Sequence, residues 1–66
     1  MSMKKITVHE CSGNREIVIF VSTIVAIQNV DFGGNYKSEI YTTGFFQFST
    51  TETVDEILYM MCNAKP

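Results

Sequence analysis

Three residues of types that often do chemistry stand out in this sequence: His9, Cys11 and Cys62. A histidine beside a thiol could form a nucleophilic pair, and the trio could contribute to a zinc site. Zinc sites use four protein ligands, or three and a water, mostly in short paired spacings, and this chain has no Cys-x-x-Cys. Nucleophilic catalysis also needs an orienting group and a concave site, which a chain of 66 residues can hardly enclose. We therefore predict no metal, no cofactor and no enzymatic activity.

Two other groups that resemble functional motifs are better explained by local structure. Glu52, Asp55 and Glu56 form a carboxylate cluster, but they fall at the start of a predicted helix, where capping accounts for them. Gly33-Gly34 lacks the lysine and the Ser/Thr of a phosphate-binding loop. It is predicted to be a turn.

The two cysteines leave two interpretations open. In a reducing cytosol both would be free thiols, with Cys62 acting as a small buried apolar group. A disulfide between Cys11 and Cys62 would instead tie the first turn to the last helix.

The charge pattern bears on partners and location. The formal net charge is −2, and nucleic-acid binding requires several basic residues on one face. Here the basic residues are scattered, so we do not expect a nucleic-acid partner: Lys4, Lys5, Arg15, Lys37 and Lys65. No apolar run approaches the ~20 residues of a membrane span, and the N-terminus does not resemble a signal peptide. We expect no membrane association and a cytoplasmic location, in the host cytoplasm if the protein is viral.

Hydrophobic alternation and turn residues predict an antiparallel meander of about five strands in a single domain, 1–66, with an ordered core from about residue 4 to 63. The predicted strands are 4–9, 16–21, 24–30, 38–42 and 45–48. Turns are expected at 11–15, 31–35 and 43–44, where glycine and asparagine tolerate positive φ. The first two strands should form a hairpin.

A helix is expected after the strands. Thr53 and Glu56 have the spacing of a capping box, in which each side chain bonds the other residue's backbone N–H. One apolar stripe follows and is expected to pack on the sheet: Val54, Ile57, Leu58, Met61 and Cys62. The chain is therefore predicted to be an α+β domain, a small strongly bent or barrel-like meander with one C-terminal amphipathic helix.

The second half of the chain resembles the FlbD-like small flagellar proteins, and similar short bacterial and phage proteins. The resemblance is carried by Ile24-Val-Ala-Ile27, by Ile40-Tyr-Thr-Thr-Gly44 and by Phe48-Ser-Thr-Thr-Glu-Thr-Val-Asp-Glu-Ile57. It implies β-hairpins followed by a capped helix, and no catalytic residues. The segment Phe32–Tyr36 and the pair Phe45-Phe46 depart from that pattern.

Apolar residues lie on both faces of the predicted sheet. In the strand 16–21, Ile17, Ile19 and Val21 face one way, while Val18 and Phe20 face the other. One short helix cannot cover two faces, so either the sheet curls into a small barrel or a second chain covers the outer face. The predicted interaction surface consists of Val18, Phe20, Phe45, Tyr59 and Met60.

Two functions remain open at this point. The first is a non-enzymatic interaction protein, homo-oligomeric, that acts by binding a protein partner. The second is a phage-type protein that sequesters a signalling nucleotide at a site between subunits. Aromatic side chains would stack on its base and basic ones would meet its phosphate: Arg15, Tyr36, Lys37, Tyr41 and Phe45.

Overall fold

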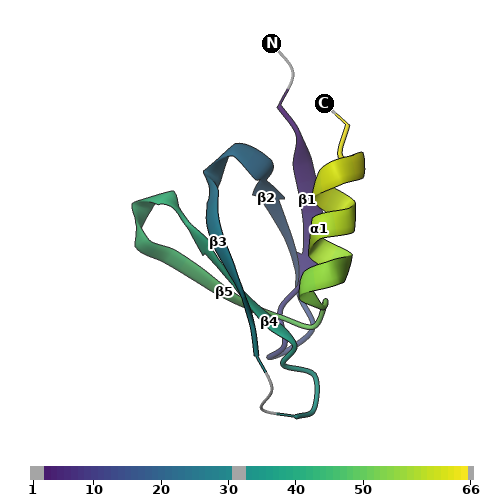
Figure 1. Ribbon diagram of the computed structural model, residues 1–66. Coiled ribbons are helices and arrows are strands. Elements are labelled where there is room, and N and C mark those ends of the chain that lie inside the picture. Colours follow the sequence, from purple (N-terminus) through teal and green to yellow (C-terminus); the bar gives the residue numbers. More distant parts are fainter. Residues whose placement is uncertain (1–2, 31–32, 66) are drawn as a thin grey trace.

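The computed structural model describes residues 3–30 and 33–65. Figure 1 shows five strands and a C-terminal helix, which confirms the α+β class. In chain order the elements are β1 (Lys5–His9), β2 (Glu16–Phe20), the 3-10 helix η1 (Val21–Thr23), β3 (Ile24–Asn29), β4 (Ser38–Thr42), the 3-10 turn η2 (Thr43–Phe45), β5 (Phe46–Thr50) and α1 (Val54–Asn63). Asp31 and Phe32, part of the predicted turn 31–35, lie outside the described residues.

The strands form two antiparallel sheets, β1–β2 and β3–β4–β5. Every strand pairs with a neighbour in sequence, as expected for a meander, but β2 and β3 do not pair, so the five predicted strands are divided between two sheets. The sheets meet at one end, where Glu10 pairs with Thr50 and the Cys11 N–H donates to the Ser49 carbonyl at 3.0 Å. From this junction β5 and β1 diverge (Figure 1), and the two sheets do not close into a barrel.

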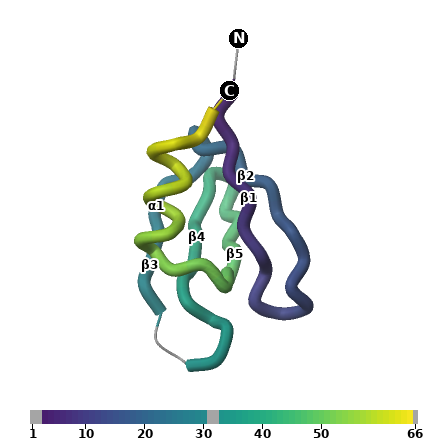
Figure 2. Tube along the Cα trace, turned by 90° about the vertical axis from the view of Figure 1, so that its right-hand side faces the viewer, coloured from purple at the N-terminus to yellow at the C-terminus, as the bar shows by residue number. Residues whose placement is uncertain are grey.

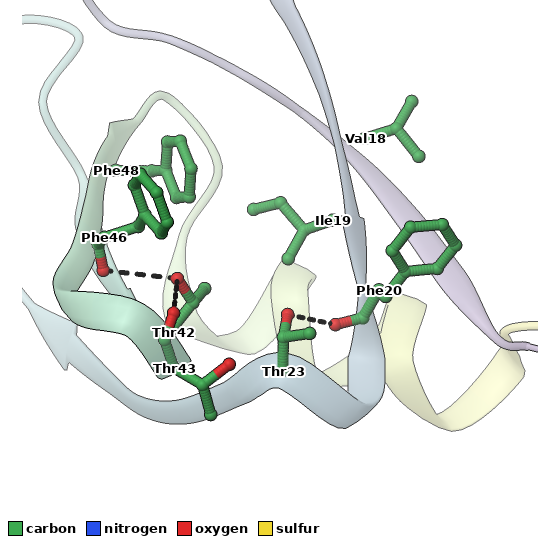
Figure 3. Close-up of a pocket in the computed structure, with 8 residues that line it drawn as sticks. All are labelled: Val18, Ile19, Phe20, Thr23, Thr42, Thr43, Phe46 and Phe48. Carbon is green, nitrogen blue, oxygen red and sulfur yellow. Dashed lines mark hydrogen bonds between the residues drawn. The ribbon is translucent and has the colours of Figure 1, made fainter.

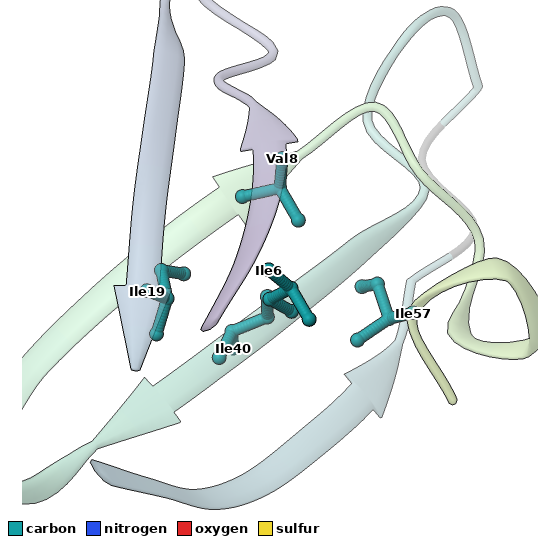
Figure 4. Packing of buried hydrophobic residues seen from close by; sticks show 5 residues of the cluster. All are labelled: Ile6, Val8, Ile19, Ile40 and Ile57. Atoms are coloured by element: carbon teal, nitrogen blue, oxygen red, sulfur yellow. The ribbon is translucent and has the colours of Figure 1, made fainter. Parts of the chain in front are cut away.

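The core lies between the two sheets and the helix (Figure 4). Its side chains come from alternate strand positions, because successive residues of a strand point to opposite faces. The buried aliphatic residues are Ile6, Val8, Ile19, Ile40 and Ile57. With so few buried residues, the core is thin, and large apolar side chains remain on the surface.

Helix α1 begins as predicted. The Thr53 hydroxyl accepts from the Glu56 N–H at 3.1 Å, and the Glu56 carboxylate accepts from the Thr53 N–H at 2.9 Å. The helix lies beside β1 and contacts β1 and β3 (Figures 1 and 2). This placement leaves the outer face of the β1–β2 sheet uncovered at Val18 and Phe20, which are exposed.

The inward face of α1 differs from the predicted stripe. Leu58 and Cys62 are exposed, whereas Met60, expected on the surface, is half-buried against the core. Each helical residue advances by about 100°, so a face centred near Ile57 takes in residues three, four and seven positions on and leaves Leu58 at its margin. The inward residues are Val54, Ile57, Met60, Met61 and Ala64.

Candidate functional site

The exposed apolar side chains are concentrated in two uncharged segments. No Asp, Glu, Lys, Arg or His occurs from Ile17 to Val30, or from Ile40 to Thr51. In the fold these segments supply most of β2, all of β3 and most of the β4–β5 hairpin. Five of the exposed large apolar residues come from them: Val18, Phe20, Val25, Phe45 and Phe46. These segments therefore contribute an apolar surface with no charged residue of their own.

An open groove of about 310 Å³ runs between β2 and the β4–β5 hairpin. Val18, Ile19 and Phe20 line one wall, and Phe46 and Phe48 the other. In Figure 3 the Ile19 side chain points toward Phe46 and Phe48, whereas those of Val18 and Phe20 point to the other side of the strand. The remaining lining residues are Thr23, Thr42 and Thr43. Two of these threonine hydroxyls are occupied within the chain: Thr23 donates to the Phe20 carbonyl at 2.7 Å, and Thr42 to the Phe46 carbonyl at 3.3 Å.

The lining residues show that the groove follows the edge of β2. Val18, Ile19 and Phe20 are consecutive, so they cannot all point to one face of a strand. Ile19 is buried, while Val18 is 56% exposed on the outer face. A groove that touches all three must run along the side of β2 that β1 does not occupy. The exposed feature is therefore a strand edge as well as an apolar surface.

Phe45 is the most exposed apolar residue of this surface. It was predicted to begin the fifth strand, but it belongs to the turn η2, and β5 starts at Phe46 and continues to Thr50. Its side chain is fully exposed (104%), and its backbone has φ = 68°. A bulky residue in the left-handed region is strained, whereas glycine or asparagine adopts it readily. The sequence thus keeps a phenylalanine where both solvation and backbone conformation disfavour it.

A second hollow, of about 420 Å³, adjoins Phe45. It is lined by Val25, which lies at a β-bulge and is 64% exposed, together with Tyr41, Phe46 and Gln47. Phe46 lines this hollow and the first groove. The two form one surface. Phe46 and Val25 were not predicted as site residues, although the long uncharged segments in which they lie were a usable signal.

The structure divides the predicted interaction surface into two parts. Val18 and Phe20 lie on the groove and Phe45 at the hairpin tip, whereas Tyr59 and Met60 line a different hollow on the helix side, together with Thr7. Thr7 is the cross-strand partner of Val18, so the helix-side hollow reaches the same outer face of the β1–β2 sheet.

The helix-side hollow contains the closest ion pair of the described residues. His9 Nδ1 lies 2.7 Å from Glu52 Oε2, and the His9 N–H donates to Glu52 Oε1 at 2.9 Å. The hydrogen bond to Glu52 raises the pKa of His9 above its usual value, with a further contribution from the charge of Glu16. Burial raises the pKa of Glu52, but the two hydrogen bonds from His9, a backbone hydrogen bond within Glu52 and the charge of His9 together lower it overall. The pair holds the segment before α1 against β1.

The predicted nucleotide-binding residues surround a carboxylate. Glu39 accepts from the hydroxyls of Tyr36 at 2.5 Å and Tyr41 at 2.7 Å, and from the Gln47 amide at 2.6 Å. The hydrogen bonds from Tyr36, Tyr41 and Gln47 lower the pKa of Glu39. A carboxylate that stays ionised repels a phosphate at this place.

The two basic residues predicted for that site do not meet at it. Arg15 pairs with Glu10 at 2.9 Å on the exposed β1–β2 turn, and Lys37 is exposed in the loop before β4. Phe45 and Tyr41 both line the hollow at the hairpin tip. Of the predicted set, the structure therefore brings together Tyr36 and Tyr41 at Glu39, and Tyr41 and Phe45 in the lining of one hollow.

Both cysteines are free: Cys11 is half-buried and Cys62 is exposed, so the expectation of a buried Cys62 was wrong. The reason is its place on α1, outside the arc that faces the core. Among the described residues, no three His, Cys, Asp or Glu side chains gather to form a metal site. In the same residues, no helix has the length and apolar character needed to cross a membrane.

Comparison of the chain with models of protein families, with curated proteins and with solved structures found no match. The resemblance to FlbD-like proteins therefore stays a hypothesis, and the function has to be argued from the surface itself.

Proposed function

We propose that this protein is a non-enzymatic interaction protein that forms homo-oligomers and binds a protein partner through the apolar surface formed by β2 and the β4–β5 hairpin. The observation that carries the proposal is Phe45, fully exposed and held at a positive φ beside an uncharged groove. Aromatic anchors of this kind supply much of the binding energy at protein interfaces.

The composition of the surface supports a protein partner. Interface centres are depleted of charged residues and enriched in aromatic ones. The lining of both hollows consists of aliphatic, aromatic, hydroxyl and amide side chains and glycine, without a charged residue. Since the core is thin, burying this surface would also stabilise the fold by mass action.

The nucleotide-binding alternative has less support from the same contacts. Its tyrosines donate to Glu39, and its arginine is paired with Glu10, so an incoming phosphate would meet an anion. We retain it as the outcome to consider if the apolar surface proves inert.

Sedimentation velocity over a range of micromolar concentrations tests the proposal. The wild type should show a concentration-dependent shift toward dimers or larger species. Phe46→Asp puts a charge between the two hollows and should abolish the shift, whereas Leu58→Asp, on the exposed side of α1, is the matched control and should keep it. A wild type that stays monomeric at every concentration would rule out the oligomer.

A further inference from the structure

We propose that the free edge of β2 pairs with β2 of a second copy of this chain, antiparallel and centred on Val18, so that the two β1–β2 sheets join into one. This inference rests on the proposed function and names the strand that makes the contact. It commits to a second copy of the chain as the occupant of the groove.

The hydrogen-bond ladder identifies which backbone groups are available. The Val21 N–H donates to the Lys4 carbonyl, and the Glu10 N–H donates to the Arg15 carbonyl. Hydrogen-bonded and non-hydrogen-bonded pairs alternate along an antiparallel ladder. In this ladder the hydrogen-bonded pairs therefore join an even-numbered residue of β1 to an odd-numbered residue of β2. Residues between these pairs direct their N–H and C=O away from the partner strand. On β2 these residues are Glu16, Val18 and Phe20. The Phe20 carbonyl already accepts from the Thr23 hydroxyl at 2.7 Å, so only its second lone pair is left for a partner strand.

The opposite edge of the same sheet shows how such groups are normally satisfied. His9 lies between hydrogen-bonded pairs, and its outward N–H donates to Glu52 while its outward carbonyl accepts from Thr51. Along β2 the corresponding outward groups face the groove, where Phe46 and Phe48 form the far wall. An added strand would give them partners of the same kind.

Only one register uses all three outward residues at once. In an antiparallel pair centred on Val18, Val18 faces its own counterpart, and Glu16 and Phe20 face the partner's Phe20 and the partner's Glu16. A shift of two residues in either direction changes every pair and leaves one of the three residues without an outward partner. The twofold axis therefore passes through the Val18 pair, as closed dimers require.

The charges of the β1–β2 sheet agree with this arrangement. Lys5 is the cross-strand partner of Phe20, and His9 is that of Glu16. In the joined sheet, the row containing Lys5 and Phe20 continues into the partner's Glu16 and the partner's His9. Phe20 separates Lys5 from the partner's Glu16, so the two opposite charges are second neighbours across the joined sheet. In a parallel pairing each Glu16 would instead lie beside its own counterpart, which like-charge repulsion disfavours.

Beyond Glu16 at its first position, the edge lacks the features that keep exposed strands apart. Monomeric proteins protect free edges with lysine, proline or an inward-pointing charge. From Ile17 to Thr23 this chain has none of them, and the residues are mostly β-branched or aromatic. From Ile17 onward, a strand of this composition is itself an uncharged segment that the groove would accept.

Disulfide trapping at the axis tests the register. Val18→Cys is made in a chain carrying Cys11→Ser and Cys62→Ser, and is oxidised at micromolar concentration. Across a hydrogen-bonded antiparallel pair the Cα atoms are ~5.5 Å apart, which suits a disulfide. We expect most of the protein to form a covalent dimer. The control Val25→Cys, similarly exposed on β3, should form little.

A charge variant gives the same test without cysteine chemistry. Val18→Lys places two lysines face to face across the axis and should raise the dimer Kd about tenfold or more, whereas Val25→Lys should leave it unchanged. Circular dichroism confirms that each variant folds. A wild type that dimerises while Val18→Cys fails to cross-link would overturn this inference and leave the proposed function standing. A wild type that never dimerises would remove both.

Discussion

His9 and Glu52 are joined twice: the imidazole Nδ1 lies 2.7 Å from one carboxylate oxygen, and the His9 N–H donates to the other at 2.9 Å. A single carboxylate thus holds both the side chain and the backbone of the last residue of β1. The contact links the first strand to the segment that leads into α1, far along the chain.

This pair predicts a window of pH for maximal stability. The pKa of His9 is raised from 6.5, so its contribution is complete below pH 6.5 and is lost as the pH rises through the raised value. The pKa of Glu52 is lowered from 4.5, so its contribution is present above pH 4.5 and is lost as the pH falls through the lowered value. We expect the highest Tm between these limits.

Thermal unfolding followed by circular dichroism from pH 4 to pH 8 measures this dependence. His9→Gln should lose the decline in Tm on the alkaline side of the window. If wild type and variant gave parallel curves, the pair would not control that decline.

The inward face of α1 predicts different costs for adjacent residues. Ile57 is fully buried among core side chains, so Ile57→Ala should lower the free energy of unfolding by about 2–5 kcal/mol. Leu58 is 50% exposed, and Leu58→Ala should change it by less than about 1 kcal/mol. Urea unfolding of both variants compares them. Equal losses would contradict the observed orientation of the helix.

The capping box predicts a coupled pair. Thr53→Ala removes the acceptor of the Glu56 N–H and should destabilise the protein by about 1 kcal/mol. Glu56→Ala removes the reciprocal bond to the Thr53 N–H and should also destabilise the protein. A double-mutant cycle in urea should show that the two losses are not additive. Strict additivity would mean that the two hydrogen bonds act independently.

The conformation and exposure of Phe45 lead us to expect that replacing it raises the stability of the fold but weakens association. Phe45→Asn relieves a positive φ and removes an exposed aromatic ring, so it should raise the free energy of unfolding by about 1 kcal/mol. If Phe45 anchors a partner, the same variant should weaken association in sedimentation experiments. A variant that is more stable and associates as well as the wild type would remove Phe45 from the interface.

Local patterns predicted most of the fold. The capping box needs only Thr53 and Glu56, and alternation over five or six residues identifies a strand, so these elements were found within a few residues of their bounds. The rotation of the helix was not predicted correctly. Apolar residues occupy more than half of its circumference, so the sequence alone does not distinguish Met60 from Leu58 as the inward residue; contacts with β1 and β3 decide this.

The candidate site was less predictable, because it depends on contacts between distant segments. The outward orientation of Val18 and Phe20 followed from strand alternation. Their position opposite Phe46 depends on how the two sheets are set at the junction of Glu10 and Thr50, and the pairing of His9 with Glu52 has the same origin. The positive φ of Phe45 was unexpected, because that conformation is rare for a phenylalanine.

The junction between Glu10 and Thr50 also determines an order of folding events. Each hairpin closes a short loop, whereas this bridge closes a loop that contains most of the chain, and loop closure becomes more costly as loops lengthen. The β1–β2 hairpin should therefore form while the sheets are still apart. Until the bridge forms, a nascent chain would display the mostly apolar edge of β2 with neither β5 nor α1 nearby, and newly made copies would first meet one another through it.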